Sequence, residues 1–289
     1  MPIIEPVIRP PAEANSILLQ ITTSCSANSC TFCGAYKDKR FTIKSKAEIY
    51  ADIDMYATHY PDARKVFLMD GDALVVGNKK IVPILKKLNE VFPKLTRIAS
   101  YANGYNIMKR TKYELQELID YKLNLIYLGL ESGNQQILND CNKRSTVKEM
   151  ISAVQLADEI GIKSSVIVLL GLGGKKNSEL HVKDTIVALN KMQPRFLSFL
   201  SLMLVPNTKL YQEYIDGSFQ QLDQTELLQE TFSILQGLEL NQTIFRTNHA
   251  SNYLPLEGRL PKDKAKLVYV LKTAVQGDAY LRPEILRGL

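Results

Sequence analysis

Three of the four cysteines of the chain stand within nine residues, in the stretch TSCSANSCTFCG (23–34). They are Cys25, Cys30 and Cys33. Thiolates at such spacing can hold a metal centre, and two of them could instead form a redox pair. An iron–sulfur cluster is usually held by four thiolates. A cluster with three protein ligands would keep one iron open for another molecule.

Zinc is the first alternative for this stretch. Structural zinc takes four ligands, often as two tight pairs, and only Cys30 and Cys33 form such a pair. The three histidines of the chain lie far away in sequence, and Cys141 would have to complete the set in space. We therefore favour an iron–sulfur cluster over zinc, and expect Cys141 to be an incidental thiol.

The elements that position the cysteines follow a regular alternation of short apolar runs and longer stretches of helical period. The predicted strands are 16–23, 65–71, 97–103, 124–132, 163–171 and 196–203. Helices are expected over 46–56, 80–92, 112–122, 146–161 and 178–192. Apolar runs with few alternating polar positions indicate parallel strands that are covered on both faces.

This alternation predicts an α/β fold, a partial (β/α)6 TIM-like barrel with a C-terminal extension, and leaves a doubly wound sheet as the alternative. We expect an extended, proline-rich N-terminal arm over 1–15, the core over 16–219 and a mostly helical extension over 220–289. The extension is expected to complete the substrate cavity. The cysteines follow the first strand, and loops after the strands build the active site of such barrels.

Composition and charge narrow the class of protein. The chain has 289 residues, 45% of them hydrophobic, with a net charge of +6 and no apolar run long enough to span a bilayer. We see no secretory signal and expect a cytoplasmic protein. The densest basic run, 37–40, could favour RNA, but no RNA-binding motif accompanies it.

The cysteine stretch resembles the cluster loop of the radical S-adenosylmethionine (radical SAM) superfamily, with an aromatic residue, Phe32, just before the last cysteine. The common loop has three residues between its first two cysteines, and this chain has four. The resemblance runs from about residue 16 to residue 212 and is nearest to coproporphyrinogen-dehydrogenase-like members. It implies that Cys25, Cys30 and Cys33 bind a 4Fe–4S cluster.

Further segments carry the resemblance at the ends of later strands. MDGDAL resembles the segment that binds the SAM amino group, which implies this role for Asp70, Gly71 and Asp72. YLGLESG implies a ribose contact for Glu131, and VIVLLGLGG, with Leu170, resembles the segment beside adenine. LMLVPNTKLY resembles a segment of the same subgroup. Taken alone, the aspartates could cap a helix, the glutamate could pair with a lysine, and the glycines could form a turn.

Other residues acquire candidate roles from their places in this arrangement. Ser100 and Asn103 could reach the ribose or the substrate, and Met203 could contact the cofactor. Arg40, together with Lys37 and Lys39, could pair with the SAM carboxylate or with a substrate anion; a solvated loop is the alternative.

The C-terminal run IFRTNHASNYLPL concentrates polar side chains after two apolar residues. If it forms a strand and loop beside the sixth strand, Arg246, Asn248, His249, Ser251 and Asn252 could line the substrate cavity. His249 could then act as an acid or base near neutral pH. Alternatively, these side chains serve turn chemistry and internal hydrogen bonds.

The resemblance implies an enzyme that cleaves SAM reductively to methionine and a 5′-deoxyadenosyl radical, which abstracts a hydrogen atom from the substrate. The cofactor supplies the chemistry and the protein positions it. A one-electron donor such as flavodoxin or ferredoxin is expected, with a small-molecule substrate. The competing hypotheses are a zinc- or cluster-binding, RNA-interacting protein without radical chemistry and a nucleotide-binding protein with redox-sensing cysteines.

Overall fold

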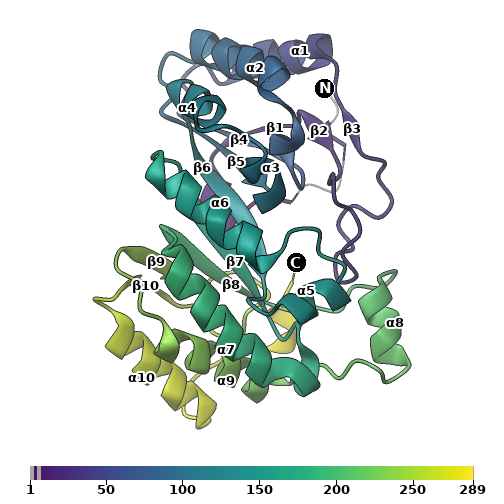
Figure 1. Ribbon diagram of the computed structural model, residues 1–289, viewed down its shortest axis with the longest axis vertical. Coiled ribbons are helices and arrows are strands. Elements are labelled where there is room, and N and C mark those ends of the chain that lie inside the picture. The colour runs from purple at the N-terminus through teal and green to yellow at the C-terminus, as the bar shows by residue number, and fades with distance from the viewer. Residues whose placement is uncertain (1–2, 5–7, 289) are drawn as a thin grey trace. The chain divides into compact units, whose positions relative to one another are not determined.

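A computed structural model describes residues 3–4 and 8–288 of the chain (Figure 1). The predicted N-terminal arm therefore lies partly outside the described residues. The contacts within the chain define two compact units. Unit 1 comprises Met1–Asn28, Ala35–Leu128 and Leu156–Ser164, and unit 2 comprises Ser29–Gly34, Gly129–Gln155 and Ser165–Leu289.

The sheet of unit 1 is parallel, with neighbours in the order β1-β4-β5-β6. These strands are β1 (Ile17–Leu19), β4 (Lys65–Leu68), β5 (Arg97–Ala102) and β6 (Leu123–Glu131), the last of which ends in unit 2. A separate antiparallel pair joins β2 (Thr22–Thr23) to β3 (Thr42–Ile43). The second predicted strand is shorter than expected, because Asp70 adopts a left-handed backbone with φ of +67°.

The helices of unit 1 differ in whether a side chain caps their first backbone N–H groups. They are α1 (Lys46–His59), α2 (Asn78–Val91), α3 (Gly104–Met108) and α4 (Lys112–Asp120), with short 3-10 turns at Pro11–Glu13 and Ala73–Val75. Capping boxes start α1 at Ser45 with Glu48 and α4 at Thr111 with Glu114. The apolar faces of α1 and α2 are buried, and the two helices pack together.

In unit 2 the parallel neighbours β7 (Lys163–Leu170), β8 (Phe196–Ser201) and β9 (Thr243–Arg246) are followed by the antiparallel β10 (Glu257–Leu260). β9 is the strand beside the sixth strand that was considered for the polar C-terminal run, and it pairs with β8 in parallel. Counted together, the eight strands make a mostly parallel sheet, which confirms the α/β class.

The helices of unit 2 are α5 (Gln135–Asp140), α7 (Gly174–Met192), α8 (Lys209–Ile215), α9 (Gln224–Gly237) and α10 (Lys264–Val275), with a 3-10 turn at Glu284–Leu286. α6 (Val147–Glu159) begins in unit 2 and ends in unit 1. α9 packs against both α7 and α10 (Figure 1). The predicted helix over 178–192 begins four residues earlier, within the glycine-rich segment after β7. The division into arm, core and extension stays a prediction.

Glu13 ties the N-terminal turn to the sheet of unit 1. Its carboxylate is fully buried and accepts two hydrogen bonds of 2.7 Å from Arg97 and one of 2.6 Å from the hydroxyl of Tyr127. Burial and the neighbouring carboxylate raise the pKa of Tyr127. This contact joins residues more than 80 positions apart and holds the chain just before β1.

We predict that Glu13→Ala lowers the free energy of unfolding by about 3 kcal/mol, because it leaves a guanidinium and a hydroxyl without their acceptor. Chemical denaturation monitored by circular dichroism measures the change. The control is Glu159→Ala, which removes an exposed ion pair with Lys112 and is expected to cost about 0.5 kcal/mol. Equal losses in the two variants would contradict the prediction.

Candidate functional site

The segments that follow β2, β4 and β5 in unit 1 bring several predicted site residues together. Cys25 follows β2, Asp70–Asp72 follow β4, and Asn103 follows β5. The carboxyl ends of parallel strands meet at the same edge, where ligands of α/β proteins bind. The contacts below show that these three segments touch one another.

Gly71 lies directly against Cys25. A Cβ atom built on Gly71 would lie 2.6 Å from Cys25 Cβ and 2.8 Å from Cys25 Sγ. The Gly71 N–H also donates to the carbonyl of Ser24, at 3.2 Å. Only glycine allows this approach, so the backbone after β4 fixes where the first cysteine of the loop stands.

Asp72 is the centre of a buried hydrogen-bond network. Its Oδ2 accepts from the Ser26 hydroxyl at 2.6 Å, from Asn103 Nδ2 at 3.1 Å and from Asn106 Nδ2. Burial raises the pKa of Asp72, against these hydrogen bonds. Its Oδ1 is buried and has no hydrogen-bond partner in the described part of the chain. One carboxylate oxygen is therefore available to a donor or cation.

Asp70 is also fully buried. Gln20, one residue after β1, donates from Nε2 to Asp70 Oδ2 at 2.7 Å. Burial raises the pKa of Asp70, and the Gln20 hydrogen bond opposes this shift. Asp70 thus holds the ends of β1 and β4 together, while Asp72 connects the cysteine loop to the end of β5.

The second half of the cysteine loop belongs to unit 2. Thr31 N donates to the carbonyl of Cys141 at 3.0 Å, and its own carbonyl accepts from Leu210 N at 3.0 Å. Phe32 packs against an apolar cluster of Ile137, Cys141, Leu172, Leu202 and Leu210. These contacts hold the segment that carries Cys30 and Cys33 to α5 and α8.

Cys141 is a packing residue in this cluster. Its side chain is 4% exposed, and burial raises the pKa of its thiol to about 12. A thiol with this pKa is protonated at neutral pH in the metal-free protein.

The four cysteines are all free of disulfides, so the three in the loop keep the donor chemistry that a cluster requires. Cys25 belongs to unit 1, whereas Cys30 and Cys33 belong to unit 2. Within either unit, the described residues contain no group of three His, Cys, Asp or Glu side chains that could hold a metal ion. The joint ligation by three cysteines stays a prediction.

Glu131 pairs with Lys143 across 2.8 Å, and both side chains are largely buried. Glu131 has a φ of +62°, and a Cβ on Gly129 would lie 2.1 Å from Glu131 Oε1. Glycine at 129 therefore makes room for this carboxylate. The pairing is the ion pair that was weighed as the alternative to a ribose contact, and it leaves the ribose contact a prediction.

The glycine-rich segment after β7 begins at the buried Leu170. Gly171 has a φ of +80° and donates its N–H to Glu230 Oε2 at 2.7 Å. The segment then enters α7 at Gly174, whose φ is +60°. Left-handed positions of this kind favour glycine, so the local sequence follows from the backbone path.

The remaining predicted residues of the core have varied surroundings. Ser100 is buried in β5 and donates to the carbonyl of Tyr101 at 2.8 Å. The Arg40 side chain is exposed, and Met203, just after β8, is half-buried. Lys37 donates to the carbonyl of Asn28 at 3.4 Å.

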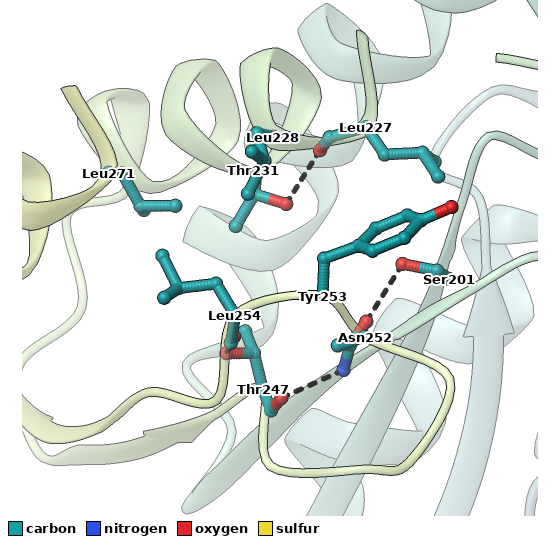
Figure 2. A pocket seen from close by; sticks show the side chains of 9 residues that line it. All are labelled: Ser201, Leu227, Leu228, Thr231, Thr247, Asn252, Tyr253, Leu254 and Leu271. Atoms are coloured by element: carbon teal, nitrogen blue, oxygen red, sulfur yellow. Dashed lines mark hydrogen bonds between the residues drawn. The ribbon is translucent and has the colours of Figure 1, made fainter. Parts of the chain in front are cut away.

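The polar C-terminal run closes over the end of β8 (Figure 2). The Ser201 hydroxyl donates to Asn252 Oδ1 at 2.9 Å, and Asn252 Nδ2 donates to the carbonyls of Phe199 and Thr247. The cavity beside these residues measures about 10 Å³, room for one water molecule at most. Ser251 and Asn252 therefore hold the loop in place, and their part in lining the substrate cavity stays a prediction.

His249 and Arg246 flank this loop. His249 Nδ1 lies 2.9 Å from the Ser251 hydroxyl, and burial with the charge of Arg282 lowers the pKa of His249. Arg246 pairs with Glu257 at 3.0 Å on the neighbouring β10. Both side chains therefore have internal partners, and their catalytic roles stay predictions.

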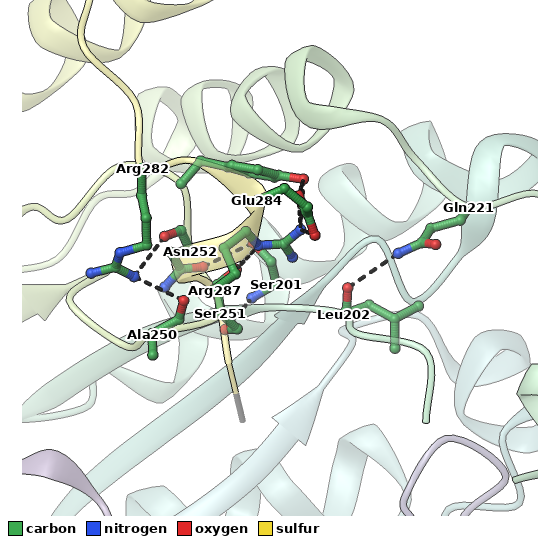
Figure 3. A network of polar contacts seen from close by, with 10 residues as sticks. Ser201, Leu202, Gln221, Ala250, Ser251, Asn252, Arg282, Glu284 and Arg287 are labelled. Carbon is green, nitrogen blue, oxygen red and sulfur yellow. Dashed lines mark hydrogen bonds and ion pairs between the residues drawn. The ribbon is translucent and has the colours of Figure 1, made fainter. Parts of the chain in front are cut away.

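Two arginines near the end of the chain fasten the same loop (Figure 3). Arg282 donates to the carbonyls of His249, Ala250 and Asn252 at 2.8–3.0 Å. Arg287 donates to the carbonyl of Ser251 at 2.8 Å and stacks over the ring of Tyr253. The sequence analysis missed both arginines, because backbone carbonyls as acceptors carry no sequence signal.

A cavity of about 590 Å³ lies in unit 2, a volume typical of small-molecule sites. The second half of the cysteine loop, α5, α7 and α8 contribute to its wall. Its lining combines apolar side chains with charged ones of both signs, namely Ile137, Leu172, Leu210 and Phe219 with Asp140, Lys175, Lys176 and Glu213.

The model of the Radical SAM superfamily matches residues 19–186, more than half of the chain. The chain belongs to the radical SAM superfamily. It is therefore an enzyme of a superfamily that uses a 4Fe–4S cluster and SAM, as the sequence resemblance implied. None of the helices in the described part of this radical SAM chain is long and apolar enough to cross a membrane.

Known proteins similar to this radical SAM chain include an uncharacterised protein of Methanocaldococcus jannaschii, 27% identical over 172 residues, 59% of this chain and 44% of the relative. Coproporphyrinogen III oxidase of Escherichia coli aligns with a TM-score of 0.59 and 19% identity, over 76% of this chain and 52% of that one. A radical SAM methyltransferase of Kitasatospora setae, solved with cobalamin and a 4Fe–4S cluster, aligns with a TM-score of 0.57 and 16% identity. The alignment covers 70% of this chain and 39% of that one.

The alignments span about half or less of the length of these three proteins. The structural likenesses show the fold, the partial barrel of radical SAM enzymes, and confirm the predicted fold class. The activities and substrates of these relatives are their own.

Several residues around the predicted site were missed from the sequence. Gln20, Ser26 and Asn106 hold the two aspartates, and Lys143 pairs with Glu131. Polar residues placed just after predicted strands were the available signal. It would have found Ser26 and Asn106, whereas Gln20 lies inside the predicted strand 16–23 and Lys143 lies beyond a helix.

We predict that Gly71→Ala weakens incorporation of iron by about tenfold, because a side chain at 71 displaces Cys25 and overpacking of this kind costs about 1–3 kcal/mol. Iron per chain after anaerobic reconstitution at limiting iron measures the effect. Gly77→Ala is the control, since nothing lies within 4 Å of a Cβ at that glycine. Iron uptake equal to the control would contradict the prediction.

We predict that Cys141 reacts with iodoacetamide at pH 8 at least about a hundredfold more slowly than the loop cysteines in folded, metal-free protein. Burial keeps its thiol protonated and covered, and alkylation requires the thiolate. Peptide mass spectrometry over time gives the four rates, and unfolded protein is the control in which the rates converge. Similar rates in the folded protein would show that Cys141 is not packed as described.

Proposed function

We propose that this enzyme uses Cys25, Cys30 and Cys33 to hold a 4Fe–4S cluster and acts on a small-molecule substrate by hydrogen-atom abstraction. When bound and reduced, the cluster and SAM supply reductive cleavage of the sulfonium to methionine and a 5′-deoxyadenosyl radical, which removes the hydrogen atom. Radical SAM enzymes take their electrons from a reductant, and we propose a flavodoxin or ferredoxin for this role. A cytoplasmic location is part of the proposal.

The observation that carries the proposal is the close packing of Gly71 against the Cys25 side chain. Gly71 leaves no space for a side chain against this cysteine, and the same segment contributes the buried Asp72. The contact at Gly71 thus fixes the position of the Cys25 thiol, a candidate metal ligand, relative to the carboxylate of Asp72. This pairing supports a site for a metal centre whose partner molecule carries an ammonium group.

Asp72 is suited to bind the amino group of SAM. Three side-chain donors occupy its Oδ2, which supports the ionised form against the effect of burial. Its Oδ1 is left for an ammonium donor, and a charge-assisted hydrogen bond of this type is stronger than a neutral one. Asn103 acts here by orienting Asp72.

Glu131 and the segment from Leu170 onward are proposed to bind the ribose and the adenine. Lys143 orients the Glu131 carboxylate, so that it can accept hydrogen bonds from ribose hydroxyls. His249 and Arg246 are proposed for the substrate side. In the free protein their hydrogen bonds to Ser251 and Glu257 hold them in place.

The first experiment is anaerobic reconstitution with iron and sulfide, followed by reduction with dithionite in the presence of SAM. We expect about four irons per chain and formation of 5′-deoxyadenosine, because a cluster with one open iron binds SAM. Cys30→Ala is expected to lose both, and Cys141→Ala to retain both. Zinc in place of iron with no cleavage of SAM, or normal cleavage by Cys30→Ala, would contradict the proposal.

Glu131→Ala tests the ribose contact. We expect the dissociation constant for SAM to rise about tenfold with iron content unchanged, the loss of a charged hydrogen-bond acceptor. Equilibrium binding under anaerobic conditions measures it. Lys143→Met is the matched control, because it breaks the same ion pair but keeps the carboxylate, and we expect a smaller change. Unchanged affinity in Glu131→Ala would place the ribose contact elsewhere.

A further inference from the structure

Buried polar groups on two helices of unit 2 contact the ends of β6 and β7. Ser132 follows β6, His181 lies on α7, Glu230 lies on α9 and Gly171 follows β7. Ser132 and His181 are fully buried, and Glu230 is 2% exposed. Ser132, His181 and Glu230 have no role in the proposed function so far.

Glu230 reaches the glycine-rich segment directly. Its Oε2 accepts from the Gly171 N–H at 2.7 Å, and its Oε1 accepts from the Ser178 hydroxyl at 2.7 Å. The first contact joins α9 to the loop, and the second joins α9 to the first turns of α7. One carboxyl group therefore sets the position of the backbone on both sides of the segment 171–178.

His181 continues the connection towards β6. Its Nδ1 lies 2.9 Å from the hydroxyl of Ser132, the residue next to Glu131. Its Nε2 lies 3.9 Å from Glu230 Oε2, which is too far for a hydrogen bond. The imidazole thus fills the space between the two strand ends and contacts one of them.

Burying a carboxyl group in a helix interface costs free energy, because the group loses its hydration. A leucine or methionine would pack there without this cost. The acceptor is nevertheless required by Gly171, whose left-handed backbone points its N–H at α9. Both oxygens of Glu230 are hydrogen-bonded, and a buried polar group that is satisfied in this way specifies one backbone position.

We propose that Glu230 is a positioning residue for the glycine-rich segment, holding the backbone at Gly171 where it can lie against the adenine of SAM. The inference rests on the proposed function for the adenine contact, whereas the hydrogen bond to Gly171 stands on its own. α9 lies beyond the residues matched by the family model, so this role is a contribution of the C-terminal part of this chain.

The neutral form of the side chain is sufficient for this task. Burial raises the pKa of Glu230 to about 7, so the group is protonated over most of the acidic range and keeps an oxygen for Gly171. Glutamine offers the same oxygen at the same position. Alanine offers no acceptor, and aspartate is shorter by one methylene group and retracts the acceptor from the loop.

The experiment compares Glu230→Ala and Glu230→Gln with the matched control Gln229→Ala, which alters an exposed neighbour on the same helix. In metal-free protein, amide hydrogen exchange of residues 170–174 is expected to be about tenfold faster in Glu230→Ala, since a lost hydrogen bond opens the segment. In the reconstituted holoenzyme, the dissociation constant for SAM is expected to rise about tenfold. For Glu230→Gln and Gln229→Ala, we expect both the exchange rate at 170–174 and the dissociation constant for SAM to stay within about twofold of the parent values.

Methionine distinguishes positioning from general loosening, because it lacks the adenosyl group. Its affinity and the iron content are expected to be unchanged in Glu230→Ala. If Glu230→Ala does not fold, Glu230→Asp replaces it with the same expected results.

Unchanged exchange at 170–174 would overturn the contact. Faster exchange with unchanged SAM affinity, or equal losses of SAM and methionine affinity, would overturn the positioning role. A parent protein that binds no SAM would refute the proposed function, and the exchange data would still decide whether Glu230 holds Gly171.

Discussion

The contact between the Gly71 backbone and the Cys25 side chain determines how the first half of the site is built. The loop after β4 passes directly against the loop that follows β2, and a side chain at position 71 would not fit between the two loops. Asp70 and Asp72 on either side of Gly71 reinforce this approach, one through Gln20 and the other through Ser26. Hydrogen bonds of the two carboxylates therefore link these segments, and Cys25 packs against the glycine between the two aspartates.

In unit 2, side chains from helices and loops hold the ends of the strands in place. The end of β6 is fixed by Lys143 and His181, and the end of β7 is fixed from α9 by Glu230. Arg282 and Arg287 hold the loop after β9 through its carbonyls. Glu230, Arg282 and Arg287 satisfy backbone groups that irregular chain leaves open, which is the general requirement for burying a loop. Lys143 and His181 instead contact the side chains of Glu131 and Ser132.

The strand–helix alternation and the cysteine spacing predicted the fold class and the superfamily, because both are local patterns. The strand at Thr243–Arg246 was considered as one interpretation of the sequence, since Ile244 and Phe245 stand out in a polar run. The partners of Asp70, Asp72 and Glu131 were not, because they come from loops whose spatial order depends on the fold. Glu230 looked like any glutamate of an amphipathic helix, and only the packing of α9 against α7 shows that it is buried.

Folding transfers a proton between two side chains of unit 2. Burial raises the pKa of Glu230 from 4.5 to about 7 and lowers that of His181 from 6.5 to about 4. Between pH 4.5 and 6.5, the unfolded chain carries one proton on the imidazole, whereas the folded chain carries one on the carboxyl group. The number of bound protons is then equal in both states, so by linkage this pair adds no pH dependence to stability in that window. Above pH 6.5 only the carboxyl group differs between the two states, and its contribution to stability falls as the pH rises through 7.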